Sequence, residues 1–198
     1  MRTRIFMAAA IAAGALAIAG CGSSGSKSGG STKAANPNKP EVSPAGDIPD
    51  NQAYVAYTPP GAGFSIKVPE GWARTTTGGA TKFADKLNSV VVESVPARSA
   101  PTVQDAKSTD VPRISAGAKH FKLGKVSIVK RTAGPAVLIT YTVDSPADPV
   151  TGKVTTDAVE RYVFFNKGKR IVVTLTGAKG ADNVDPWKIV TNSVRFSG

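Results

Sequence analysis

The single cysteine of the chain, Cys21, most limits what the sequence can fold into. The 198 residues include one Cys and one His, so no disulfide can form within the chain. The same counts exclude a zinc site made from several Cys and His side chains. A Ser–His–Asp triad would depend on His120 alone, and no G-x-S-x-G motif accompanies it. A hydrophobic core must therefore hold the fold together, and we expect a protein that is not an enzyme.

Cys21 ends an apolar leader. Two arginines precede residues 5–19, which carry no charge and are fewer than the roughly 20 residues of a transmembrane helix. The leader ends in Ile18-Ala19-Gly20-Cys21, which resembles the lipobox of bacterial lipoproteins. The resemblance implies that residues 1–20 are a lipoprotein signal peptide and that Cys21 is lipidated, with acyl chains such as palmitate. An ordinary secretory signal followed by a coincidental cysteine is the alternative.

A lipidated Cys21 would place the protein on the outer face of the cell membrane. Two acyl chains hold a protein stably, since each buried CH₂ contributes about 0.8 kcal/mol. Residue 22 is Gly, so the Asp that retains Gram-negative lipoproteins in the inner membrane is absent from the sequence. The Ala- and Gly-rich composition is typical of a high-GC genome and suggests an actinobacterial source. Cys21 would then be an anchor and not a nucleophile.

Residues 21–51 are predicted to be the lipidated cysteine and a flexible linker. Gly, Ser, Pro, Asn and Lys dominate this stretch, and it offers little apolar surface to bury. Residues 52–198 are predicted to form one globular domain. The whole chain has a formal net charge of +11, which favours adhesion to anionic lipid headgroups, acidic wall polymers or acidic protein faces.

The domain reads mainly as β-strands. Apolar and polar residues alternate along residues 64–68, and residues 89–95 are rich in β-branched side chains. The strands are predicted at residues 54–57, 64–68, 73–77, 81–84, 89–95, 120–131, 136–144, 154–165, 169–176 and 194–196. Helices are predicted at residues 102–108, at residues 111–118, and from Asp185 as N-cap with Pro186 at the first helical position. The helices lie between blocks of strands, which indicates an α+β fold with an antiparallel sheet. A three-residue turn at residues 166–168 is predicted to join the last long hairpin.

An ordered set of residues resembles the PsbP/Mog1 family, including its bacterial lipoprotein members of the LpqN/LpqT type. The set is Gly63-Phe64-Ser65-Ile66-Lys67-Val68-Pro69 and Gly71-Trp72, then Phe83, Val90-Val91-Val92, Trp187 and Ser193-Val194-Arg195-Phe196. The resemblance covers residues 54–197. It implies an α/β/α sandwich around a central antiparallel sheet, with a non-catalytic accessory or binding role. The metal ligands of some members are not recognisable here, so no functional residue is carried over.

Basic side chains gather on two predicted hairpins. One set is Lys119, Lys122, Lys125, Lys130 and Arg131, and the other is Arg161, Lys167, Lys169 and Arg170. Either set is a candidate anion- or partner-binding face. The alternative is that exposed strands carry such charges to prevent edge-to-edge pairing. Two features argue against nucleic acid as a partner. The expected location lies outside the cytoplasm, and no aromatic residues alternate with the basic ones.

Other residues give weaker indications of a metal-binding, catalytic or ligand-binding site. Asp144 and Asp148 flank a loop and could supply oxygen ligands to Ca²⁺, but the spacing fits no EF-hand and a solvated loop is favoured. His120 is read as a surface or capping residue. Trp72 and Trp187 are read as core anchors. No metal and no cofactor is expected.

Three functions are compatible with this sequence. The first is a membrane-anchored, non-catalytic accessory protein that binds an envelope protein complex. The second is a carrier that holds a lipid or other apolar small molecule between the sheet and the helices. The third, least favoured, is a hydrolase that uses His120 as its base.

Overall fold

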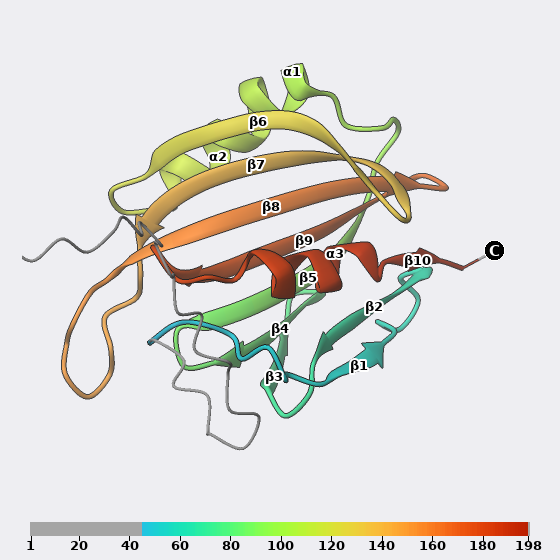
Figure 1. Cartoon of the computed structure of the whole chain (residues 1–198). Coiled ribbons are helices and arrows are strands. Elements are labelled where there is room, and N and C mark those ends of the chain that lie inside the picture. Colours follow the sequence, from blue (N-terminus) through green and yellow to red (C-terminus); the bar gives the residue numbers. More distant parts are fainter. Residues whose placement is uncertain (1–44, 198) are drawn as a thin grey trace, which may run out of the picture. The chain divides into compact units, whose positions relative to one another are not determined.

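A seven-stranded antiparallel sheet dominates the computed structural model, which describes residues 45–197 (Figure 1). In spatial order its strands are β3 (Ala73–Thr77), β4 (Ala80–Asp85), β5 (Asn88–Pro96), β9 (Lys169–Ala178), β8 (Thr156–Asn166), β7 (Gly134–Asp144) and β6 (Lys122–Arg131). β3 and β6 are its two edges. We call this the main sheet.

A second, three-stranded antiparallel sheet has the order β1 (Tyr54–Tyr57), β2 (Phe64–Pro69) and β10 (Arg195–Phe196). In its central strand Phe64, Ile66 and Val68 are buried and the residues between them are more exposed, as the alternation of the sequence predicts. Phe196 pairs with Phe64. The C-terminal segment therefore returns to complete a sheet that begins near the start of the domain.

Helical structure occurs in two places. α1 (Val103–Asp105), a π-helical turn η1 (Ala106–Asp110) and α2 (Val111–Ala116) follow one another directly. Thr102 caps the first turn, with a reciprocal hydrogen bond from its own N–H to the Asp105 carboxylate. α3 (Val184–Asn192) precedes β10. Within the described residues, no helix is long and apolar enough to cross a membrane.

The two faces of the main sheet have different covers. On one face, Ala106 packs with Val137, Ile139, Val163 and Val172, so the segment from α1 to α2 lies over β7, β8 and β9. On the other face, α3 and the three-stranded sheet pack together against the main sheet; Figure 1 shows α3 in front of the strands and α1 and α2 behind them. The predicted antiparallel sheet is confirmed. An α/β/α sandwich describes the fold only in part, because a second sheet shares one outer layer with α3.

The folded domain begins before residue 52. Ile48 is only 5% exposed, and its N–H donates to Asn183 Oδ1 at 2.7 Å. The carbonyl of Gly46 accepts from Asn88 Nδ2 and from Asn183 Nδ2, both at 2.9 Å. The end of the predicted linker is thus part of the domain, and the boundary at residue 51 is too late. Cys21 and the rest of residues 1–44 lie outside the described residues.

Two local predictions are wrong in detail. The β8–β9 hairpin turns on two residues, Lys167 (φ 45°) and Gly168 (φ 74°), because a two-residue turn with two positive φ angles matches the twist of the strands. The N-cap of α3 is Asn183 and not Asp185. The Asn183 side chain makes no capping hydrogen bond, since it is used by Ile48 and Gly46.

Candidate functional site

The structure does not gather the predicted basic residues on one face. Lys122, Lys125 and Lys130 are exposed on the edge strand β6, whose register shifts between Leu123 and Val126. Lysines and a bulge on an edge strand both oppose pairing with another sheet. These three lysines therefore fit the edge-protecting alternative better than an anion-binding face.

Arg131 points into the protein instead of toward solvent. Its guanidinium group donates to Tyr162 Oη at 2.7 Å and to Thr191 Oγ1 of α3 at 3.0 Å, and it lies over the Tyr162 ring. The Tyr162 hydroxyl in turn donates to Glu160 Oε2 at 2.7 Å. Burial, followed by Glu160, raises the pKa of Tyr162. Arg131 thus joins the main sheet to α3 and has a structural role.

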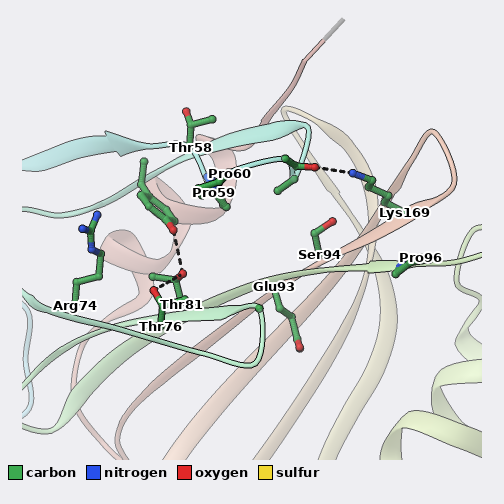
Figure 2. Close-up of a pocket in the computed structure, with 14 residues that line it drawn as sticks. Thr58, Pro59, Pro60, Arg74, Thr76, Thr81, Glu93, Ser94, Pro96 and Lys169 are labelled. Carbon is green, nitrogen blue, oxygen red and sulfur yellow. Dashed lines mark hydrogen bonds between the residues drawn. The ribbon is translucent and has the colours of Figure 1, made fainter.

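Lys169 lies at one end of a pocket of about 760 Å³ between the segment after β1 and strands β3 to β5 (Figure 2). Its Nζ donates to the carbonyl of Gly61 at 2.7 Å, and Arg74 lies at the opposite end. Tyr57 Oη and Thr81 Oγ1 are 2.9 Å apart, and Thr81 Oγ1 lies 3.1 Å from Thr76 Oγ1. The polar groups of this pocket are therefore largely satisfied by one another.

Arg161 and Arg170 meet on the opposite face of the main sheet. They line a cavity of about 630 Å³ beside the helical segment, which we call the arginine cleft. Its charged residues are Glu93, Arg98, Asp110, Arg113, Arg161 and Arg170. Arg161 donates to Glu93 Oε1 and to Thr174 Oγ1, both at 2.9 Å, and Arg113 pairs with Asp110. Sequence reasoning named only two of these residues, since the others come from a loop, a helix and a neighbouring strand.

A larger cavity of about 790 Å³ opens on the same sheet face between α2 and the loop after β7. We call it the apolar cleft after the aliphatic side chains that line its floor and sides, which are Leu87, Val91, Ile114, Val143 and Val159. Charged residues line it as well: Lys82, Lys86, Arg113, Asp144, Asp148, Lys153 and Asp157. Arg113 lines both clefts. Val91 and Glu93 lie two residues apart on β5, so they share a face and line adjacent cavities. The two clefts thus adjoin along the strands.

Asp157 is a buried carboxyl group beside the apolar cleft. Burial raises its pKa, and the positive charge of Lys82 opposes this only in part. The folded protein therefore binds the Asp157 proton more tightly than the unfolded chain does. The free energy of unfolding therefore falls as the pH rises from the Asp157 pKa of the unfolded chain to the higher Asp157 pKa of the folded protein.

The substitution Asp157→Asn is expected to raise the free energy of unfolding at pH 7 and to leave it unchanged at about pH 3, where both side chains are neutral. Urea unfolding of both proteins at the two pH values measures this. An equal difference at both pH values would contradict a role for the ionised carboxylate.

The other residues considered as possible catalytic or metal-binding groups form hydrogen bonds with their neighbours. The His120 side chain is exposed, and its Nδ1 lies 2.6 Å from Asp144 Oδ2. Asp148 accepts from the N–H groups of Val150 and Thr151 within its own loop, and these bonds, Thr151 first, lower its pKa. Among residues 45–197 no group of three or more His, Cys, Asp or Glu side chains could hold a metal ion.

Comparison with known proteins gives a likeness of fold. No family model and no curated protein matches the chain. The solution structure of cyanobacterial PsbP (CyanoP) from Synechocystis sp. PCC 6803 is similar, with 19% identity and a TM-score of 0.51, over 78% of this chain and 98% of that chain.

Two further solved structures are more distantly similar. The Ran-binding protein Mog1p of Saccharomyces cerevisiae has 10% identity and a TM-score of 0.48, over 73% of this chain and 96% of its own. LpqN of Mycobacterium tuberculosis, described as involved in cell envelope biogenesis, has 13% identity and a TM-score of 0.41, over 75% of this chain and 93% of its own. Together with the antiparallel sheet and the layers on its two faces, the likeness to CyanoP identifies the fold of this chain as PsbP-like.

Proposed function

We propose that this chain is a lipid-anchored accessory protein that acts by binding, not by catalysis, on the outer face of the cell membrane. The leader that ends at Cys21 supports the anchor and the location. The two adjoining clefts on one face of the main sheet support a binding role.

The apolar cleft is the feature of the structure that supports the choice of ligand. It has room for a small molecule, and its lining combines aliphatic side chains from β5, α2, β7 and β8 with charged ones such as Lys82 and Lys86. An anchored protein would sample the lipids and lipid precursors of its own membrane at a high local concentration. We therefore propose an amphiphilic small molecule as the ligand.

A protein partner is the second candidate, and β6 supports it. Ile128 is 62% exposed and Leu123 is 45% exposed on this edge strand. Exposed aliphatic side chains of this kind are suited to contact an apolar protein surface. The partner would be a component of the cell envelope.

Two matched substitutions separate these candidates. Val91→Lys adds a charge inside the apolar cleft and Ile128→Lys adds one on the exposed edge. Each full-length protein is purified from crosslinked membranes, and its lipids and proteins are identified by mass spectrometry. We expect Val91→Lys to lose a co-purifying amphiphile that the wild type and Ile128→Lys retain.

Loss of a crosslinked envelope protein from Ile128→Lys alone would favour the protein partner. Equal lipid content in wild type and Val91→Lys would contradict binding in the apolar cleft. Thermal unfolding of each variant verifies that it is folded.

A further inference from the structure

The arginine cleft has more positive than negative charge. Four guanidinium groups and two carboxylates line it: Arg98, Arg113, Arg161, Arg170, Glu93 and Asp110. Arg161 is paired with Glu93 and Arg113 with Asp110. Within residues 45–197, Arg98 and Arg170 have no acidic partner. The cleft therefore has two positive charges that the described protein does not neutralise.

Two buried N–H groups in this cleft also lack acceptors. Nε of Arg161 and Nε of Arg170 are inaccessible to solvent and have no hydrogen-bond partner among the described residues. A buried donor without an acceptor costs about 1–3 kcal/mol, and more when the group is charged. Such groups are rare in folded proteins unless a ligand or ordered water satisfies them. Both Arg161 and Arg170 line the cleft.

We propose that the arginine cleft binds a phosphate monoester group. A dianion neutralises the two unpaired positive charges, and phosphate oxygens match the planar fork of the guanidinium group. Arg170 is the principal ligand, since it lines the cleft and its charge has no acidic partner among the described residues. Arg98, which is exposed in the loop after β5, also lines the cleft and supplies the second unpaired charge.

A third buried atom fits the same ligand. Asp110 Oδ2 has no partner among the described residues, while its other oxygen accepts from Arg113. A carboxylate oxygen accepts hydrogen bonds only. A hydroxyl on the ligand, such as that of a glycerol phosphate, would donate to it once the Asp110 side chain turns toward the cleft.

The phosphate group has two chemical sources, a lipid headgroup or a free phosphate monoester. The apolar cleft adjoins the arginine cleft along β5 and β8, where Val91 precedes Glu93 and Val159 precedes Arg161 on the same face. A phospholipid monoester could therefore place its headgroup among the arginines and its chains beside Val91. The placement of a phospholipid across both clefts rests on the proposed amphiphile function, whereas the phosphate site does not.

The test uses the full-length protein in phosphatidylcholine nanodiscs and three soluble probes, measured by calorimetry. The probes are glycerol 3-phosphate, dihexanoyl phosphatidic acid and dihexanoyl phosphatidylcholine. The first has the phosphate monoester without chains, the second has both, and the third has the same chains with a zwitterionic diester. We expect saturable binding of the first two and weaker binding of the third.

Arg170→Gln is expected to lower the affinity for glycerol 3-phosphate and for phosphatidic acid by about tenfold or more, because a charged hydrogen bond is removed. Arg98→Gln, at an exposed loop position, is the second variant and is expected to weaken the same two probes without affecting the fold. Lys130→Gln, an exposed basic residue on β6, is the matched control and is expected to bind like the wild type. Circular dichroism of each variant confirms that it is folded.

Tighter binding of phosphatidic acid than of glycerol 3-phosphate would assign the site to a lipid headgroup, and equal binding would assign it to a free phosphate monoester. Binding of phosphatidylcholine as tight as that of phosphatidic acid would overturn the phosphate site and leave the amphiphile proposal intact. Equal effects of Arg170→Gln and Lys130→Gln would also overturn it, since they would show attraction by net charge alone.

Discussion

The Cys21→Ala protein is expected either to leave the membrane fraction almost completely or to remain there unprocessed, with its apolar leader uncleaved. If Cys21 carries two or more acyl chains, each buried CH₂ contributes about 0.8 kcal/mol to membrane binding, so loss of the chains removes nearly all of the affinity. Fractionation of cells, with quantitative blotting of pellet and supernatant, measures the change.

Ser23→Ala is the matched control, because it changes a small residue two positions away and leaves the thiol in place. Metabolic labelling with an alkyne palmitate should mark the wild type and Ser23→Ala, but not Cys21→Ala. The lipoprotein proposal would be wrong if the wild type is unlabelled, or if Cys21→Ala remains in the membrane pellet after its leader has been cleaved.

Asn183→Ala is expected to lower the free energy of unfolding by about 3 kcal/mol. Asn183 is 3% exposed and joins three segments of the chain through Ile48 N–H, Gly46 C=O and Asn88 Oδ1. The substitution leaves the Ile48 N–H and Asn88 Oδ1 buried without partners, at about 1–3 kcal/mol for each group. The carbonyl of Gly46 retains its bond from Asn88.

Asn192→Ala is the matched control for this prediction. It lies at the other end of α3 with an exposed side chain, and exposed substitutions of this kind change stability by about 0.5 kcal/mol or less. Urea unfolding of the three proteins measures the difference. Similar stabilities of Asn183→Ala and Asn192→Ala would show that residues 46–48 contribute little to the folded domain.

The sequence predicts the strands well because their signal is local. Alternation at Phe64, Ile66 and Val68, and the β-branched run in β5, indicate strands without any knowledge of their partners. The three-stranded sheet could not be predicted in the same way. It depends on pairing between Phe196 and Phe64, which are distant in the sequence, and no local pattern specifies which strands will pair.

The arginine cleft shows how one residue in a turn decides the composition of a site. With the two-residue turn, Phe165 pairs with Arg170, so Arg161 and Arg170 lie on one face of the main sheet. The predicted three-residue turn would have shifted the register by one residue and placed Arg170 on the opposite face. Arg113 was missed for a different reason, because its place in the cleft depends on how α2 packs over the sheet.

The docking of residues 46–48 has a mechanical consequence for a tethered protein. A pull on the chain that precedes residue 45 would reach the bonds of Gly46 and Ile48 with Asn88 and Asn183 before it reached β1. Asn88 opens β5, which lies inside the main sheet, and Asn183 precedes α3. Tension along the tether would therefore be resisted by the interior of the domain, while the four-residue edge strand β1 would be shielded from the load.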